Sequence, residues 1–281
     1  MITGSILAEH IRRNWTTRGR WDAMTLHRDR VMELLRRARG ESGKTLCLLG
    51  PGNGNDIELG QLAREFEKVA LVDLDEEAVG RAVSRLSAEE AQRVERHCPV
   101  ELSGVLPVLE SWRARRRRTD AEISAVKRSV MAAPRPEVGS FDVVASTCIL
   151  TQLIDAVYMS LPTKHLRRDE LLCAVRDRHL EIILEMLKLG GVGVLVTDFV
   201  VAGSTQELAP LGELTLSSSV QIAMKRSEFF TGTDPFEIRD FYKGLCGPGP
   251  TVEDVAIEGP WRWEVGGRIL RVCAVMFRRR S

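Results

Sequence analysis

The sequence lacks the features of several classes of protein. It has no run of about eighteen or more apolar residues and no charged start followed by a long apolar stretch, so we expect neither a membrane protein nor an exported one. Its six cysteines form no CxxC pair, which argues for reduced thiols in the cytoplasm and against a zinc site. We therefore expect a cytoplasmic protein without a bound metal.

A strong net charge is also absent. The 40 Lys and Arg residues balance 39 Asp and Glu residues to a formal charge of +1, so no global field attracts nucleic acid. Four consecutive arginines, Arg115 to Arg118, are suited to phosphates, but on a helix they would point in all directions, and a solvated face is favoured. The composition, 44% hydrophobic and 28% charged, is that of an ordinary globular protein with a large core.

One segment is typical of a nucleotide-cofactor site. Between Thr45 and Asp75 an apolar strand runs into Gly-Pro-Gly-Asn-Gly, a helix-like stretch follows, and Val-Ala-Leu-Val-Asp-Leu-Asp closes the unit. Glycines directly after a strand let backbone N–H groups approach a ligand, because they carry no Cβ and adopt positive φ. An acid ending the next strand can accept both hydroxyls of a ribose, and Asp73 is the first acid there. Tight turns need glycine even without a ligand, but strand, helix and acid together favour a cofactor site.

The apolar periodicity predicts a helical start followed by five βα units. A helix over residues 169–188 is expected to stop at Gly190-Gly191, and another to begin at Asp234-Pro235. A final pair of strands should close the chain as a hairpin. The expected strands cover residues 45–49, 69–72, 100–102, 141–146, 192–199, 252–258 and 268–278.

This order predicts an α/β fold, a doubly wound and mostly parallel seven-stranded sheet with a C-terminal antiparallel strand pair. We expect an N-terminal helical cap at 1–43 and a Rossmann-like cofactor-binding catalytic domain at 44–281. The domain should carry a helical insertion at about 105–140 and a variable acceptor-side segment at about 201–233.

The chain resembles the class I S-adenosylmethionine-dependent methyltransferases over roughly residues 45–278. The G-x-G-x-G spacing favours this family over nicotinamide-dependent dehydrogenases, whose pattern is G-x-G-x-x-G. The resemblance implies S-adenosylmethionine as cofactor and methyl transfer as activity. It rests on the glycine turn at 50–54, Asp73 at the family's ribose-binding acid, residues 141–144 at its fourth strand and residues 188–195 at its entry to the fifth.

The sequence departs from the family in two places. Leu48 stands where the family usually has an acid two residues before the first glycine, and Asn53, Asn55 or Asp56 is a candidate replacement. After the third strand the family often offers an acid to adenine, whereas here Leu-Ser-Gly-Val follows, so backbone groups and Ser103 are expected to hold adenine. The resemblance implies these cofactor-binding residues: Gly50, Gly52, Asn53, Gly54, Asp56, Asp73, Leu74, Ser103, Gly104, Thr147 and Cys148.

Candidate acceptor-side residues follow the fourth and fifth strands, because ligands in open α/β sheets bind beyond the carboxyl ends of the strands. Asp198 ends the fifth strand and is our first choice for a general base or an acid that orients the acceptor; a turn cap is the alternative. Thr151 and Gln152 can orient a polar acceptor, although neither is a base.

The cap and the terminal hairpin offer further candidates. His27 is a second candidate base and Arg28 a ligand for an acceptor carboxylate, against the alternative of solvated helix surface. Trp261 can stack on an aromatic acceptor or complete a core. His179 repeats with apolar residues on one helix face, which indicates a hydrogen-bonded core residue.

Three functions stay open. The leading hypothesis is a methyltransferase for a small-molecule acceptor, with specialised metabolism as a compatible context. An RNA methyltransferase on the same fold would use Arg115 to Arg118. A non-catalytic cofactor-binding partner protein is supported only by Leu48 and the missing adenine acid. Nucleic acid is disfavoured as a partner, no membrane is expected, and a homo-oligomer is compatible with the sequence. The acceptor atom, whether O, N, C or S, stays open.

Overall fold

The computed structural model describes residues 5–112, 118–162, 164–202, 218, 230–246, 251–265 and 267–281, with the backbone alone at 200–202. The strands are β1 (Thr45–Leu49), β2 (Lys68–Val72), β3 (Val94–His97), β4 (Phe141–Thr147), β5 (Leu187–Ala202), β6 (Val252–Val265) and β7 (Arg268–Arg279). They form one sheet of order β3-β2-β1-β4-β5-β7-β6. The pairs from β3 to β5 are parallel, and β7 is antiparallel to both β5 and β6. The predicted fold class is confirmed.

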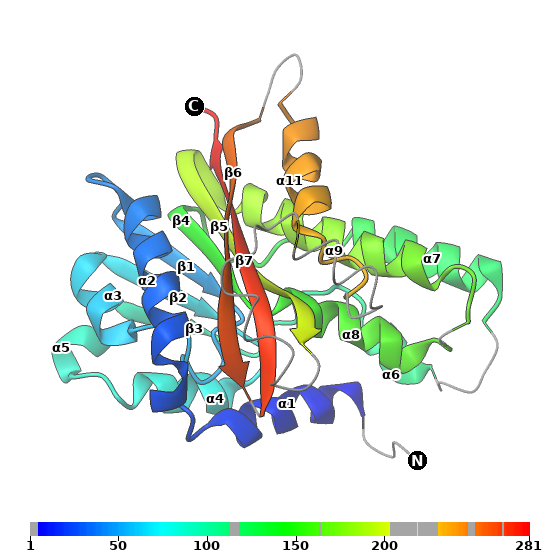
Figure 1. Cartoon of the computed structure of the whole chain (residues 1–281), viewed down its shortest axis with the longest axis horizontal. Coiled ribbons are helices and arrows are strands. Elements are labelled where there is room, and N and C mark those ends of the chain that lie inside the picture. The colour runs from blue at the N-terminus through cyan, green and yellow to red at the C-terminus, as the bar shows by residue number, and fades with distance from the viewer. Residues whose placement is uncertain are drawn as a thin grey trace.

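Helices lie on both faces of this sheet. They are α1 (Ile6–Thr17), the 3-10 helix η1 (Asp22–Met24), α2 (Thr25–Arg39), α3 (Leu59–Glu65), α4 (Glu76–Val83), α5 (Ala88–Ala91), α6 (Leu106–Ser111), α7 (Asp120–Met131), α8 (Leu150–Ser160), α9 (Arg168–Glu185) and α11 (Pro235–Gly244). Figure 1 shows α2 to α5 on one side of the sheet, α6 to α9 and α11 on the other, and α1 across one end. Among the described helices, none has the length and apolar character needed to cross a membrane.

The side chains of β1 alternate between two cores, one on each face of the sheet. Leu46 and Leu48 pack under α2 and α3, whereas Cys47 and Leu49 pack under α8 and α9. A strand buried on both faces is typical of a parallel sheet and explains the unbroken apolar run in the sequence. Leu48, where the family has an acid, is 0% exposed and fills a packing position.

The third strand was predicted wrongly. It is β3, whose polar Val-Glu-Arg-His sequence pairs in parallel with β2 at the edge of the sheet. The Val-Glu-Leu stretch at residues 100–102, where the strand was expected, begins three residues after the end of β3 and lines a cavity. An edge strand exposes much of its surface, so its sequence need not be apolar.

The end of the long helix was also predicted wrongly. Helix α9 ends at Glu185, and the two glycines expected to stop it lie inside β5. A Cβ on Gly191 would lie 2.9 Å from the carbonyl oxygen of Asp142. Close approach of β5 to β4 therefore requires glycine there.

The predicted cap contains α1, η1 and α2. On α2, Val31 and Leu35 are buried, Leu26 is 81% exposed, and His27 and Arg28 are also buried. His27 and Arg28 can be buried because each has polar partners elsewhere in the chain. Helix α1 packs separately against α6 and α8.

The C-terminal part follows the prediction. The Asp234 carboxylate accepts a hydrogen bond from the backbone N–H of Phe236 at 2.8 Å, and Pro235 is the first residue of α11. The terminal strands pair as the expected hairpin. Of the predicted variable segment, residues 203–217 and 219–229 lie outside the described residues, as do residues 115–117 of the arginine run.

Candidate cofactor and acceptor site

Two adjoining cavities lie at the carboxyl ends of the parallel strands. The smaller is lined mainly from the segments after β2 and β3, and the larger, of about 880 Å³, from those after β1, β4 and β5. Asn14, Gly50 and Gln152 line both cavities, so the two form one cleft. The cleft lies at the edge of the sheet where open α/β proteins bind ligands.

A fixed carboxylate marks the smaller cavity. Asp73, directly after β2, accepts hydrogen bonds from the backbone N–H of Gly52 at 2.7 Å and of Asp75 at 2.8 Å, one on each oxygen. Burial raises the pKa of this carboxyl, and the two backbone bonds act against that rise. Each oxygen keeps a second lone pair. Each oxygen of this fixed carboxylate can therefore accept one further hydrogen bond.

Apolar walls continue the smaller cavity away from Asp73. Leu74, Leu102 and Leu106 line it together with Ser103 and Glu101. The Glu101 carboxylate accepts a hydrogen bond from the backbone N–H of Ser103 at 2.6 Å. The sequence analysis missed Glu101 because it placed the third strand over this residue. An acid therefore does line the smaller cavity after β3.

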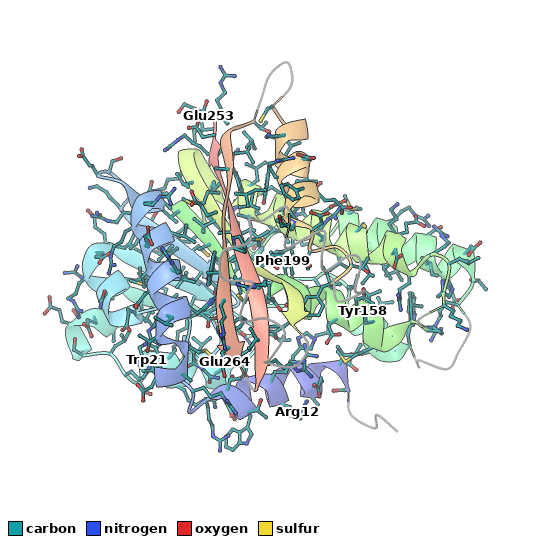
Figure 2. The ribbon with its side chains drawn as sticks, viewed as in Figure 1. Arg12, Trp21, Tyr158, Phe199, Glu253 and Glu264 are labelled. Atoms are coloured by element: carbon teal, nitrogen blue, oxygen red, sulfur yellow. The ribbon has the colours of Figure 1, made fainter. Side chains whose placement is uncertain are left out.

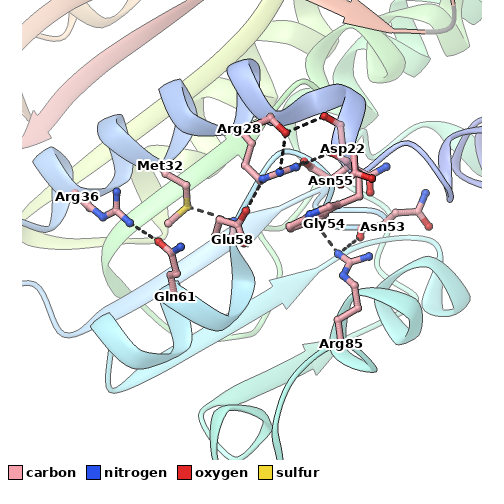
Figure 3. Close-up of polar contacts among 12 residues, drawn as sticks. Asp22, Arg28, Met32, Arg36, Asn53, Gly54, Asn55, Glu58, Gln61 and Arg85 are labelled. Atoms are coloured by element: carbon pink, nitrogen blue, oxygen red, sulfur yellow. Dashed lines mark hydrogen bonds and ion pairs between the residues drawn. The ribbon is translucent and has the colours of Figure 1, made fainter.

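The glycine turn after β1 is held from outside by arginines (Figure 3). Arg85 donates to the carbonyl oxygens of Asn53 and Gly54, at 2.7 and 3.3 Å. Gly50 and Gly52 have positive φ and line the cleft. Gly54 also has positive φ but does not line the described cavities; a Cβ there would lie 3.1 Å from that of Ala82. Packing on α4 accounts for this third glycine.

Helix α1 covers the turn. The side-chain amide of Asn14 donates to Asp75 at 3.0 Å, and the amide of Asn53 donates to the Asn14 carbonyl at 2.7 Å. Asn55 donates in the same way to the Thr17 carbonyl at 2.8 Å. A Cβ on Gly52 would lie 2.8 Å from the Asn14 side-chain oxygen. The cap is thus fastened to the segment that lines both cavities.

Asp198 lines the larger cavity. It precedes a bulge in β5, which continues to Ala202, and so does not end the strand as predicted. The parallel pairing of β4 with β5 nevertheless stops at Val196, which leaves Asp198 beyond the carboxyl end of β4. Its carboxylate accepts a hydrogen bond from Thr151 Oγ1 at 2.9 Å, and burial raises its pKa to about 6.

A strained residue lines the larger cavity next to β4. Cys148, directly after β4, has φ +52°, a left-handed conformation that costs energy for a residue other than glycine. Its N–H bonds to the Val196 carbonyl at 2.9 Å, and both Thr147 and Cys148 line the larger cavity. Burial raises the pKa of the Cys148 thiol well above its usual value, so the thiol is neutral.

Asp56 is a second acid in the larger cavity. Burial raises its pKa to about 7; the charge of Arg28 opposes the rise and that of Asp198 adds to it. Within the described ranges, no lysine or arginine forms an ion pair with Asp56 or Asp198. The neighbouring Asn55 side chain also has a buried Oδ1 without a hydrogen-bond partner in those ranges. This cavity is therefore suited to a cation that carries N–H donors.

Arg28 does not line either cavity. Its guanidinium donates to Glu58 at 2.7 Å, to the Trp21 carbonyl at 2.8 Å and to the Asn55 carbonyl at 3.1 Å, as Figure 3 shows in part. It also stacks over the Trp21 ring at 3.7 Å. These partners leave Arg28 supporting the glycine turn from behind, and its position does not favour contact with an acceptor.

His27 and Trp261 also lie behind the cavity walls. Trp261 Nε1 donates to His27 Nδ1 at 3.0 Å, and the Trp263 ring, which does line the larger cavity, stacks on His27 at 4.5 Å. Burial and the charge of Arg28 lower the pKa of His27 to about 3. The imidazole is neutral and its one acceptor nitrogen is occupied, so the geometry does not favour a general base.

Two other predicted residues have packing roles. Gly104 lies outside both cavity linings, and a Cβ there would lie 2.5 Å from that of Ala133. His179 is fully buried with Nε2 at 2.8 Å from Ser146 Oγ, as predicted for a core histidine. In the part of the chain that the structure describes, no three His, Cys, Asp or Glu side chains cluster as a metal site would require.

Several lining residues had no signal in the sequence. Helix α1 contributes His10, Ile11 and Asn14 to the smaller cavity and Arg12 to the larger. Figure 2 shows Arg12 on α1 and Tyr158 on α8, which both line the larger cavity. The only sequence feature that marks α1 is its amphipathic pattern. Which of its residues reach the cleft depends on how the cap folds back onto the sheet.

No family model matches the sequence, and no curated protein matches it. Solved structures are similar in fold. N-methyltransferase NodS from Bradyrhizobium japonicum, with bound S-adenosylhomocysteine, is 12% identical, with a TM-score of 0.46 over 90% of this chain and 87% of that one. O-methyltransferase TomG from Streptomyces achromogenes is 16% identical, with a TM-score of 0.43 over 89% and 78%. Glycopeptide N-methyltransferase MtfA is 12% identical, with a TM-score of 0.46 over 89% and 93%.

Proposed function

We propose that this protein is an S-adenosylmethionine-dependent methyltransferase that acts on a small-molecule acceptor. One observation carries the proposal: a single cleft combines the fixed carboxylate of Asp73 with two further carboxylates, the partly buried Asp56 and the buried Asp198, that form no ion pair with a described Lys or Arg. A nucleoside that carries a positively charged group would satisfy both features: its ribose hydroxyls would bind Asp73, and its positive charge would lie near Asp56 and Asp198. Dinucleotides carry negative phosphates, which these acids would repel.

The residues of the cleft can be assigned to parts of the cofactor. Asp73 would accept the ribose hydroxyls, and Ser103 and Glu101 lie where the adenine would be held. Asp56, with the free Oδ1 of Asn55, would bind the amino group. When bound, S-adenosylmethionine supplies a methyl group on a positively charged sulfur, a leaving group that is already activated.

Asp198 and Thr151 are assigned to the acceptor. The Thr151 hydroxyl fixes one oxygen of Asp198, which leaves the other to orient an acceptor hydroxyl or amine, or to take its proton. A carboxylate with a pKa of about 6 is ionised at neutral pH and can accept a proton. Alignment and exclusion of water supply much of the rate in such a displacement.

The size of the cleft supports a small acceptor. Helix α1 lies over the turn, and its Arg13 pairs with Asp155 of α8 in the lining of the larger cavity. A volume of about 880 Å³ is in the range of small-molecule sites. Of the arginine run, Arg118 is occupied by the Trp112 ring and by Glu122. We therefore place a small molecule ahead of RNA.

Calorimetry with S-adenosylmethionine and S-adenosylhomocysteine tests the proposal. We expect both to bind at micromolar concentration, and NAD⁺ to bind at least about tenfold more weakly because its phosphates meet Asp56 and Asp198. Transfer of a labelled methyl group to members of a small-molecule panel then identifies the acceptor. Absence of binding at millimolar S-adenosylhomocysteine would overturn the enzyme assignment.

A further inference from the structure

Two tryptophans of β6 enclose the ring of His27 on α2. Trp263 stacks on it with 18° between the ring planes, and Trp261 Nε1 donates a hydrogen bond to Nδ1 at 3.0 Å. His27 is 1% exposed. The donor and acceptor are 234 residues apart in the sequence, so the contact ties the terminal hairpin to the cap.

The contact with Trp261 decides which nitrogen of His27 carries the proton. An indole N–H is a donor only, so Nδ1 must offer a lone pair, and the proton of the neutral ring is on Nε2. His27 Nε2 lies 3.7 Å from Asp56 Oδ1 and 3.9 Å from Cys148 Sγ. At 3.7 Å the contact with Asp56 is electrostatic and longer than a hydrogen bond. The N–H therefore lies close to both the carboxylate of Asp56 and the sulfur of Cys148.

The other groups around Asp56 do not supply such a donor. Arg28 of α2 acts on it by charge, but its guanidinium is occupied by Glu58 and by backbone carbonyls. Asp198 of β5 repels it, and the thiol of Cys148 has its hydrogen-bond contact with His27 Nε2. Within the described residues no side chain donates a hydrogen bond to Asp56. The Nε2–H of His27, 3.7 Å from Asp56 Oδ1, is thus the positive end of a dipole close to this acid.

We propose that Trp261, acting through neutral His27, positions Asp56 to bind the amino group of the cofactor. This inference rests on the proposed function. If the proton of His27 were on Nδ1, a lone pair on Nε2 would face Asp56 and repel its charge. Trp261 excludes that tautomer. Trp261 and His27 thus act on Asp56, an acid that follows the glycine turn. The position before the turn, where the family usually has an acid, holds the buried Leu48.

A pair of ligands tests the proposal by binding alone. S-adenosylhomocysteine carries the amino group, and 5′-methylthioadenosine has the same nucleoside and sulfur without it. We expect Asp56→Asn to weaken S-adenosylhomocysteine by about 10- to 100-fold, the scale of a lost hydrogen bond to a charged group. Binding of methylthioadenosine should stay within about twofold, since no amino group is involved.

Trp261→Phe tests the positioning pair. We expect it to weaken S-adenosylhomocysteine by about three- to tenfold and methylthioadenosine by less than about twofold. Trp15→Phe is the matched comparison: it makes the same change at an exposed tryptophan that lines neither cavity. It should leave the ratio of the two affinities unchanged. Nitrogen-15 NMR of His27 should show the Nε2–H tautomer in the wild type and a mixture in Trp261→Phe.

The outcomes separate this inference from the proposed function. Equal losses for both ligands in Trp261→Phe, or an Nδ1–H tautomer in the wild type, would overturn the positioning role. Unchanged S-adenosylhomocysteine affinity in Asp56→Asn would remove Asp56 from the amino group and overturn the inference. If the wild type bound neither ligand, the proposed function itself would fail.

Discussion

The two cavities of the cleft hold their acids in different ways. In the smaller cavity, Asp73 is fixed by the backbone N–H groups of Gly52 and Asp75. In the larger, Asp198 has one hydroxyl partner, and Asp56 has only the distant N–H of His27. The smaller cavity is thus organised before a ligand arrives, whereas the larger holds negative charge that a ligand must compensate.

The same contrast appears in the pKa values. Backbone hydrogen bonds limit the rise that burial causes for Asp73. With fewer such bonds, burial raises Asp198 to a pKa of about 6 and Asp56 to about 7. Near physiological pH Asp198 is therefore mostly ionised and Asp56 partly ionised, and a cation that enters the cavity favours the ionised form of both. Selectivity for a cationic ligand therefore belongs to the larger cavity.

Asp198→Asn should have the largest effect and should confine it to the larger cavity. Removing a group that takes a proton or orients the acceptor should lower methyl transfer by about 100-fold or more. Calorimetric affinity for S-adenosylhomocysteine should change by less than about threefold, because the ligand lacks the acceptor. The transfer rate is measured with labelled S-adenosylmethionine and the best acceptor of the panel.

Thr151→Val is the graded control, since it removes the hydroxyl that holds Asp198 and keeps the carboxylate. An intermediate loss of transfer is expected. Weaker cofactor binding at unchanged turnover in Asp198→Asn would instead make Asp198 a structural residue.

Asp73→Ala should affect the smaller cavity alone. It removes the acceptor for the ribose hydroxyls and also frees the Gly52 and Asp75 N–H groups. Affinities for S-adenosylhomocysteine and methylthioadenosine should both fall by about 10- to 100-fold, because both carry the ribose. Titration calorimetry measures both. Glu77→Gln, an exposed change on α4 nearby, serves as control, and a loss confined to S-adenosylhomocysteine would move Asp73 out of the ribose site.

The smaller cavity was also the more predictable from sequence. Its turn, acid and strands lie within one βαβ unit, where local spacing dictates position, and Asp73 lines the cavity as expected. Glu101 was missed because the polar strand β3 shows no apolar signal. The error is one of register along the chain, which sequence patterns at a sheet edge do not fix.

The larger cavity depends on contacts that local patterns do not encode. Nothing around His27 indicates that a tryptophan 234 residues away occupies its acceptor nitrogen. Arg28 looks suited to an anion until Glu58 and Trp21 are seen beside it. Asp198 was found because the carboxyl ends of parallel strands meet at one edge, a rule of topology that the sequence does reveal.

The pH dependence of binding should distinguish the cavities by about tenfold. Asp56, with a pKa of about 7, is mostly protonated at pH 6 and mostly ionised at pH 8, so affinity for S-adenosylhomocysteine should rise by about tenfold over this range. Arg28 and Asp198 are the charged groups that act on Asp56, and His27 stays neutral throughout. Methylthioadenosine should bind equally at both values, and Asp56→Asn should remove the slope for the first ligand.

The stability of the free protein should change in the opposite direction. Between the ordinary pKa of 3.8 and the folded value of about 7, the folded state keeps a proton on Asp56 that the unfolded state has released. Its contribution to stability therefore falls as pH rises through this window. The contribution of Asp198 to stability falls in the same way as pH rises to its folded pKa of about 6. In thermal unfolding, the stability of Asp56→Asn should decline less from pH 6 to 8 than that of the wild type. An equal decline would mean that other groups cause the pH dependence of stability.

Asn14→Ala should have the smallest effect and should act on both cavities. Asn14 lines both, and its amide ties α1 to Asp75 at 3.0 Å. Loss of one such bond at a partly buried site costs about 1 kcal/mol, or about fivefold in affinity. Because α1 covers the cleft, the loss should appear as faster dissociation, measured by stopped-flow. Arg18→Ala, at the exposed end of α1, is the control. Equal losses for S-adenosylhomocysteine and methylthioadenosine would show that α1 acts on both cavities. A loss for S-adenosylhomocysteine alone would show that α1 acts on the larger cavity only, and would contradict the place of Asn14 in the lining of both.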